Sequence, residues 1–454
     1  MCSINKSYKL GPSGNGFHAA RAKGHKFMTY LTTFGLRNVI VRNTLILALS
    51  QASVYLIPLV TTPYIARVLG AEHYGLLGIA SNIIGNLLIF TDWGFSLSAT
   101  REVARNAGDP HALRRIFWET LAAKSLLGLA SLLVIAAVMA CVGFSNELAW
   151  IVFAGWLQVL PNAIGVGWFL QGLEAMGVMA TGVFIGRLLT IPMIFLFVHG
   201  PSDTMRVVAI AGIGSIVSVA INFYNAVQLK KLLPVTWTFS GAVRQLANGW
   251  HLFISTGATT LYTQVNVILV GIAAGPAQTG LLYGAERLQR AGKSLIGPLS
   301  AAIFPRVNKL LMEDQAHAIE LVKRLLIFQG GLTFVVSLAT FVITPYLIPV
   351  FLGAGYDGAV PALRWLSWTL FLVGLSNVLG VQIMLPFGMQ QSFTRIIAGS
   401  GLFNLAAIMP LAYYYGATGA SVSILLTEGI VTSLMGFAVW RAGVLRGKGK
   451  PFDL

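Results

Sequence analysis

Charged side chains gather in the middle of one apolar segment, and their spacing suits the binding of an anion. The segment spans residues 276–304 and is long enough to cross a bilayer as a helix, because about 20 residues suffice. Glu286, Arg290 and Lys293 stand at i, i+4 and i+7, so they share one face of that helix. Arg287 lies on the flank of this face. The face is net positive and predicts a site for a phosphate or a carboxylate.

These charges cannot face lipid. Each charged group near a bilayer centre costs about 2.5–3.5 kcal/mol, so four of them would cost roughly 10 kcal/mol. We therefore expect a polar cavity within a helix bundle, where Arg287, Arg290, Lys293 and Glu286 bind an anionic substrate. The alternative is a buried cluster of ion pairs that only fixes neighbouring helices to one another.

The composition shows which elements must position these residues. Of the 454 residues 56% are hydrophobic and only 10% are charged, and the mean hydropathy of +0.75 is too high for a soluble protein. The net charge of +16 comes from Lys and Arg between apolar runs, which indicates cytoplasmic loops rather than nucleic-acid binding. With two cysteines, no disulfide framework or cysteine-based metal site is expected, and no cofactor is predicted.

The apolar runs predict an all-α membrane protein with about twelve transmembrane helices. Their expected bounds are 44–66, 75–99, 117–142, 148–170, 182–199, 207–229, 249–273, 277–304, 323–345, 361–386, 393–415 and 419–440. Alternate loops are basic, which places both termini in the cytoplasm. The expected organisation is a basic extension (1–43), an N-lobe (44–232), a C-lobe (233–440) and a basic tail (441–454). Met28 is an alternative start to Met1.

The chain contains an internal repeat. The sequence GAEHYGLL from Gly70 recurs as GPAQTGLL from Gly275, and both glycines of the motif match at an offset of 205 positions (275 − 70 and 280 − 75). Six predicted helices in each half keep the same orientation in the membrane. The lobes should therefore be related by a pseudo-two-fold axis along the membrane normal, with a central site between them.

Other polar residues in the predicted helices extend the candidate site. Gln51 and Tyr55 on the first helix, and Tyr262 and Asn266 on the seventh, lie on polar faces and are predicted to bind substrate, although polar residues also mediate helix packing. Three carboxylates in or near membrane helices could exchange a coupling proton, because burial and basic neighbours shift their affinity for protons. They are Asp92, Glu286 and Glu428. Lys124 is expected to extend to the inner membrane surface.

Several short segments resemble polysaccharide-biosynthesis flippases. They are FTDWGF at 90–95, SATREVAR at 98–105, RIFW at 115–118, WFLQGLE at 168–174, GAER at 284–287, IFPR at 303–306 and LTE at 426–428. The pattern is that of Wzx-type O-antigen and exopolysaccharide repeat-unit translocases, in the multidrug/oligosaccharidyl-lipid/polysaccharide exporter superfamily. The similarity extends from about residue 43 to 440.

The resemblance implies a function and a location. Members of that family move undecaprenyl-diphosphate-linked oligosaccharides across the bacterial inner membrane through a cavity between two six-helix lobes. The implied partners are the lipid-linked glycan, membrane lipids, and the polymerase and chain-length machinery of the same pathway. Two alternatives stay open: a drug or cation antiporter of the same superfamily, and a membrane glycosyltransferase or polymerase. An enzyme would need clustered acid, base or metal-binding groups, which the short loops lack.

Overall fold

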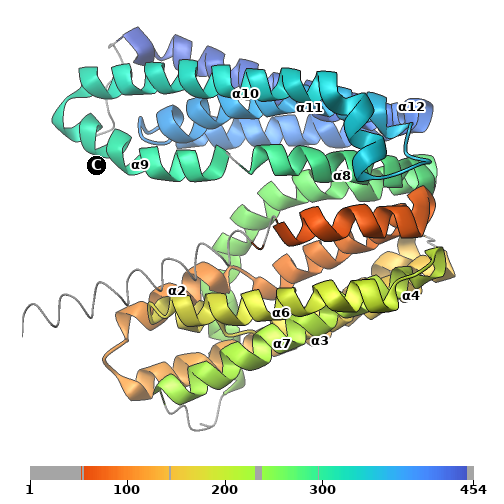
Figure 1. Cartoon of the computed structure of the whole chain (residues 1–454). Helices are drawn as coiled ribbons and strands as arrows, with labels where there is room; N and C mark the ends of the chain where they lie inside the picture. The colour runs from red at the N-terminus through yellow and green to blue at the C-terminus, as the bar shows by residue number, and fades with distance from the viewer. Residues whose placement is uncertain (1–52, 54–55, 143–144, 231–237, 295, 447–454) are drawn as a thin grey trace, which may run out of the picture.

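The computed structural model describes residues 53, 56–142, 145–230, 238–294 and 296–446, and every regular element in these ranges is helical (Figure 1). A helix over residues 56–92 comes first. The elements that follow are α2 (Phe95–Arg105), α3 (Pro110–Val142), α4 (Asn146–Ala163), α5 (Gly167–Gly172), α6 (Met176–Phe197), η1 (Pro201–Asp203), α7 (Thr204–Lys230), α8 (Phe239–Lys293), α9 (Ile296–Glu313), α10 (Gln315–Phe351), α11 (Ala359–Asn377), the π-helix η2 (Val378–Met384), α12 (Gln390–Arg441) and η3 (Val444–Arg446). The predicted all-α class is confirmed.

Nine helices among the described residues are long and apolar enough to cross a membrane, which confirms a multi-pass membrane protein. Some contain more than one pass. α12 has 52 residues and would measure roughly 80 Å if straight, more than twice the thickness of a hydrocarbon core. It folds back at Gly416 (φ 57°), and α8 folds back at Gly275 (φ 84°). Gly70 (φ 70°) occupies the repeat position that matches Gly275. Such angles favour glycine because it has no Cβ. The total of twelve passes stays a prediction.

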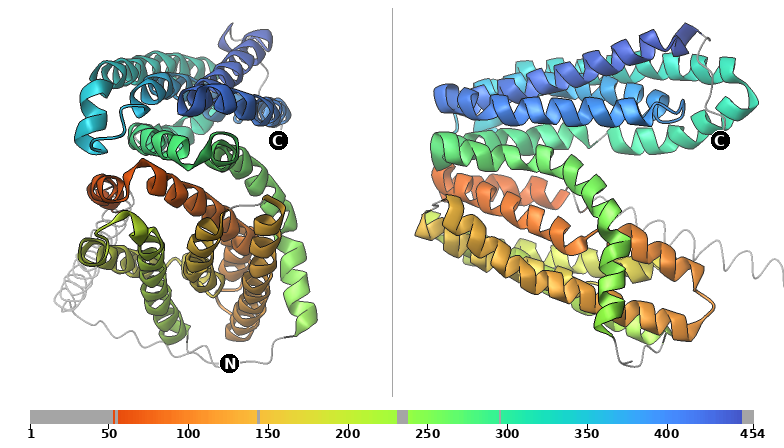
Figure 2. Two further views of the ribbon diagram at one scale, coloured as in Figure 1. Left: turned by 90° about the vertical axis from the view of Figure 1, so that its right-hand side faces the viewer. Right: turned by 180° about the vertical axis from the view of Figure 1, so that it is seen from behind.

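The helices form two groups, which we call the N-half (residues 53–230) and the C-half (from the middle of α8 to residue 446). Figure 1 shows α2 to α7 together in one group and α9 to α12 in the other, and Figure 2 shows α8 crossing between them. The groups lie close together at one end and diverge at the other (Figure 2, right). The predicted lobe boundary at 232/233 lies outside the described residues, as does the extension 1–43. The lobe limits and the pseudo-two-fold axis therefore remain predictions.

The two copies of the repeated motif pack against each other where the halves meet. A Cβ placed on Gly75 would lie 1.8 Å from the carbonyl oxygen of Pro276 and 2.8 Å from the nitrogen of Gly280. A Cβ on Gly280 would lie 1.8 Å from the carbonyl oxygen of Ala71. The contact is reciprocal, so each motif needs its second glycine to let the backbone of the other approach.

Aromatic rings continue this contact. The ring centroid of Tyr74 lies 5.1 Å from that of Tyr283 and 6.1 Å from that of Tyr356. The hydroxyl of Tyr356 donates to the carbonyl oxygen of Ala66 at 2.9 Å, which joins the two halves. The largest buried apolar cluster likewise contains residues from both halves. This end of the molecule, which we call the closed end, is therefore packed like a protein core.

The first turns of α8 are held to the N-half at the other end. Trp93 Nε1 donates to the carbonyl oxygen of Leu246 at 2.9 Å, and the Trp93 ring stacks on Phe253 with 4.2 Å between centroids. Arg244 of α8 forms an ion pair of 2.7 Å with Glu119 of α3. These contacts fix the direction from which α8 enters the C-half.

Candidate functional site

The charged face that the sequence predicts lies on the second segment of α8 and lines a cavity of about 350 Å³, which we call the C-half cavity. Arg290 Nη2 donates to Glu286 Oε2 at 2.9 Å. The Glu286 side chain is only 8% exposed, whereas that of Arg290 is 46% exposed. Lys293 and Asn266 line the same cavity. The structure therefore brings four predicted site residues together.

A carboxylate from another helix completes this cavity. Glu428 of α12 lines it together with Lys293, so two acidic and two basic side chains face the same space. Counted on α8 alone the face is net positive, but the assembled C-half cavity is charge-balanced. Balanced charges in a cavity compensate one another's desolvation and leave no net attraction for an anion.

A buried network of amide and hydroxyl groups includes three residues that line the C-half cavity, Asn266, Asn404 and Thr427. Asn404 Nδ2 donates to Asn266 Oδ1 at 2.7 Å, and the hydroxyls of Ser423 and Thr427 each donate to Asn404 Oδ1 at 3.2 Å. All four residues are buried. Three further predicted site residues cannot be placed relative to the cavity. Gln51 and Tyr55 lie outside the described residues, and the side chain of Tyr262 is not described.

Arg287 faces away from the C-half cavity. It lines three cavities beside the N-half, of about 580, 290 and 210 Å³. Its guanidinium donates to the hydroxyl of Tyr283, with Cζ 4.8 Å from the centroid of that ring. Its Nε is buried and has no hydrogen-bond partner. No carboxylate of the described chain lies within ion-pair distance of Arg287. Its charge is therefore free to attract an anion.

The cavity of about 580 Å³, which we call the N-half cavity, is polar and contains a second cation. It is enclosed by the helix over residues 56–92, by α4, α6 and α7, and by Arg287 of α8. Its polar lining includes Gln158, Asn162 and Ser218. Arg187 of α6 also lines it, and none of the described residues in its lining is acidic. Arg187 is not among the site residues that the sequence predicts, although an arginine inside a predicted span is itself a signal of function.

Asp92 and Lys124 form a separate charged pair in the N-half. Lys124 Nζ lies 3.8 Å from Asp92 Oδ1, and the two side chains are 4% and 34% exposed. Ser96 Oγ donates to Asp92 Oδ2 at 2.8 Å. The expectation that Lys124 extends to the membrane surface is wrong, because its ammonium is buried in the protein beside a carboxylate. Asp92 lines none of the cavities above, so the structure does not bring together all three predicted coupling carboxylates.

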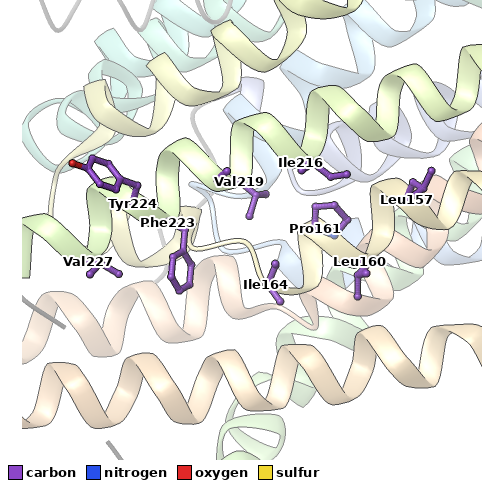
Figure 3. Close-up of a pocket in the computed structure, with 10 residues that line it drawn as sticks. Leu157, Leu160, Pro161, Ile164, Ile216, Val219, Phe223, Tyr224 and Val227 are labelled. Atoms are coloured by element: carbon purple, nitrogen blue, oxygen red, sulfur yellow. The ribbon is translucent and has the colours of Figure 1, made fainter. Parts of the chain in front are cut away.

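An apolar groove of about 640 Å³ lies between α4 and α7 (Figure 3). Leu157, Pro161 and Ile164 form one side, and Ile216 and Phe223 are on the other. Val219 lines both this groove and the N-half cavity. Many of the groove side chains are exposed, as expected for a surface in contact with lipid. No charged residue of the described chain lines this groove, so these residues add nothing to the electrostatics of the site.

A multi-pass helical membrane protein with two helix groups that meet at one end, and with polar cavities beside a charged central helix, has the architecture of a membrane transporter. The chain belongs to the polysaccharide biosynthesis protein family, whose sequence pattern matches residues 40–311. The family expected from the short motifs is thereby confirmed.

Two curated relatives match this chain over most of its length. Both carry the name "Putative O-antigen transporter". The one from Escherichia coli (strain K12) is 33% identical over 402 residues, which are 87% of this chain and 95% of the relative. The one from Shigella dysenteriae is 27% identical over 403 residues, which are 87% of this chain and 98% of the relative.

Solved structures share the fold at low sequence identity. An inward-facing multidrug resistance MATE family transporter of the MOP superfamily is similar with a TM-score of 0.68, at 14% identity over 90% of this chain and 100% of that one. The lipid II flippase MurJ in an inward closed conformation is similar with a TM-score of 0.67, at 14% identity over 90% of each chain. An outward-facing MATE family structure is similar with a TM-score of 0.56, at 16% identity over 90% of this chain and 96% of that one. These likenesses concern the fold alone.

Proposed function

We propose that this protein flips undecaprenyl-diphosphate-linked oligosaccharide repeat units across the bacterial inner membrane, for the synthesis of O-antigen, exopolysaccharide or capsule. The family and the names of the two full-length relatives support this substrate class. The movement is alternating access of the two halves around the cavities between them. The polymerase and chain-length machinery of the same pathway are the proposed protein partners.

The observation that carries the proposal is the unpaired charge of Arg287 beside cavities that lie against the N-half. A diphosphate needs cationic partners in a site of low dielectric, and the guanidinium fork can donate two hydrogen bonds to its oxygens. Arg290 lines the cavity of about 210 Å³ together with Arg287, so both can contact one anionic head. Lys293, Glu286 and Asn266 are assigned to the sugar side of the site. Gln51, Tyr55 and Tyr262 stay predicted contacts.

Coupling to an ion gradient is part of the proposal. Glu286 and Glu428 line the charge-balanced C-half cavity, and Asp92 pairs with Lys124 elsewhere. One of these carboxylates exchanges a proton during transport. Purified protein in liposomes tests this part of the proposal. Transport that depends on neither a pH gradient nor a sodium gradient would refute it.

The two alternatives fare differently. A drug or cation antiporter should have acidic groups in its N-half cavity, but the lining residues that the structure describes there include two arginines and no acid. That observation favours an anionic substrate. The named relatives are transporters and not enzymes, which confirms the expectation that the protein is not a glycosyltransferase or polymerase.

The experiment is complementation of a bacterial strain that lacks its own flippase. Surface polysaccharide and the membrane abundance of the protein are measured together. We expect the wild-type chain to restore polymer made from a matching repeat unit, and Arg287→Ala to accumulate normally and restore almost none. Full restoration by Arg287→Ala at normal abundance would contradict the assigned role, and an abundant wild-type chain that restores no repeat unit from a panel would contradict the function.

The proposed orientation can be tested with single cysteines in a background without Cys2 and Cys141. Gly200 and Tyr415 lie beside turns of the closed end, and both positions are open to a new side chain. We expect cysteines there to react with a reagent that cannot cross the inner membrane. Cysteines at Gly108 and Ser240 should react only after the membrane is permeabilised, and the reverse pattern would invert the topology.

A further inference from the structure

We propose that Arg187 of α6 is a second anion-binding residue, which binds the diphosphate of the lipid-linked substrate in the N-half cavity together with Arg287. The nature of the ligand rests on the proposed function. The existence of a two-arginine anion site rests on the cavity alone, because Arg187 and Arg287 line the same space of about 580 Å³.

The packing of α6 determines where Arg187 points. A Cβ on Gly186 would lie 2.3 Å from the carbonyl oxygen of Gly214, and a Cβ on Gly182 would lie 2.3 Å from Asn222 Oδ1. The small residues at these two positions therefore press one face of α6 closely against α7. The next residue, Arg187, is turned by about 100° from that face and lines the cavity. The rotation of α6 is thus fixed by contacts that do not involve the arginine.

No acidic residue within the described ranges compensates the charge of Arg187. Its guanidinium makes no ion pair and no hydrogen bond with any residue that the structure describes, and its side chain is half-buried. Four arginines of the described chain do form ion pairs with acids: Arg206 with Asp203, Arg244 with Glu119, Arg290 with Glu286, and Arg324 with Glu320. Arg187 stands near the midpoint of a helix that crosses the membrane. An unpaired cation at that depth destabilises the empty protein, so a ligand is its natural partner.

The two arginines match a diphosphate better than a monophosphate. A diphosphate that links a lipid to a sugar carries two negative charges on adjacent phosphoryl groups, and each guanidinium can bind one of them through two hydrogen bonds. Polar side chains of the cavity, among them Asn162 and Ser218, can donate further hydrogen bonds. Since Arg187 belongs to the N-half and Arg287 to the C-half, a head group bound by both joins the halves and favours the conformation in which they approach.

The test measures ligand binding by the purified full-length protein in lipid nanodiscs. The probes are undecaprenyl diphosphate, undecaprenyl monophosphate, undecaprenol and inorganic pyrophosphate. The variants are Arg187→Gln and Arg187→Met, and Arg206→Gln is the matched control because Arg206 is an exposed arginine at the end of the same helix pair. Affinity is read from the fluorescence of the native tryptophans, and the melting temperature of the empty protein is recorded for every variant.

We expect both Arg187 variants to bind undecaprenyl diphosphate at least about tenfold more weakly, since one charge-assisted contact is lost. Their affinity for the monophosphate should change less than threefold, and Arg206→Gln should match wild type. The empty variants should melt at or above the wild-type temperature, because no partner of Arg187 is left unpaired. Unchanged diphosphate affinity in the variants would overturn the inference, as would failure of both variants to accumulate, which would show that Arg187 supports the fold.

Two further outcomes separate this inference from the proposed function. Tight binding of inorganic pyrophosphate that depends on Arg187, without binding of the undecaprenyl diphosphate, would assign the site to a free anion and overturn the lipid ligand. A second outcome is that undecaprenyl diphosphate binds and that this binding depends on Arg187, while the wild-type chain restores no polysaccharide. That result would support the site and refute the proposed function. Full polysaccharide synthesis by Arg187→Gln would leave the function standing and overturn the site.

Discussion

Substitution of Gly75 by alanine should separate the two halves at the closed end. The new Cβ would lie 1.8 Å from the carbonyl oxygen of Pro276. Since real Cβ atoms keep at least 3.0 Å from such atoms, the two backbones must move apart by about 1.2 Å (3.0 − 1.8). Overpacking of this kind costs about 1–3 kcal/mol, and neither backbone segment can turn away as a flexible side chain would. A cost of 1.4 kcal/mol already lowers the population of the closed-end conformation about tenfold.

Spin labels can measure this change. Met205 in the N-half and Tyr415 in the C-half are exposed and lie next to turns at the closed end. Electron paramagnetic resonance measurements of the distance between labels at these two positions should give a single narrow distribution in wild type. Gly75→Ala should show a longer component, and polysaccharide restored by the same variant should fall. Gly280→Ala should behave alike, because its Cβ would meet the carbonyl oxygen of Ala71 at the same 1.8 Å.

The matched control is Gly331→Ala in α10, where a Cβ meets nothing within 4 Å. Alanine in an open helical position stabilises by about 0.5–1 kcal/mol, so this variant should keep the wild-type distance and activity. If Gly75→Ala and Gly331→Ala give the same distance distribution and the same activity, the close approach of the two motifs does not hold the halves together.

Three other perturbations have expected outcomes. Arg290→Ala leaves the buried Glu286 without its partner and should lower the free energy of unfolding by about 1–3 kcal/mol in thermal and denaturant melts, whereas adding Glu286→Gln should restore most of it. Asp92→Asn leaves the buried Lys124 unpaired and should destabilise by a similar amount of about 1–3 kcal/mol, with recovery when Lys124→Met is added; no recovery would contradict a direct pairing. The pKa of Asp314 is held below its usual value, first by the backbone N–H of His317 and then by the imidazole of that residue, so this cap on α10 is present at neutral pH and lost as the pH falls through the lowered pKa. Asp314→Ala should therefore speed hydrogen exchange at the start of α10 at pH 7 but differ little from wild type in strong acid.

Much of the fold could be predicted because a membrane leaves few choices to an apolar chain. Hydropathy alone gives the helices, since backbone polar groups in lipid must be satisfied within the helix. The repeat also predicts matching turns, and Gly70 and Gly275 do share a positive φ. The contact between Gly75 and Gly280 could not be predicted, because sequence similarity between two motifs does not say that they touch. That contact depends on how the halves are placed in space.

The site could be predicted only in part, for the same reason. The spacing of Glu286 and Arg290 on one helix predicts their ion pair, because i and i+4 residues are neighbours. The presence of Glu428 in the same cavity depends on the packing of α12 against α8, which no local pattern contains. Helical periodicity predicts Arg287 at the flank of the charged face. In the structure Arg287 lines cavities other than the C-half cavity. The ion pair of Lys124 with Asp92 could not be predicted either, because the two residues lie on different helices.

The contacts between the halves at the closed end differ in kind from those that line the cavities, and the difference suits a protein whose halves must separate. Tyr356 and Arg67 bridge the halves there through backbone carbonyl oxygens, next to glycine and tyrosine contacts. Among the described residues no ion pair joins the halves at this end. Opening it therefore leaves no charge unpaired, and water can replace each lost hydrogen bond at a modest net cost. Arg187 and Arg287 line the N-half cavity instead, and under the proposed function a bound anion, and not a fixed carboxylate, would determine how strongly the halves attract each other there.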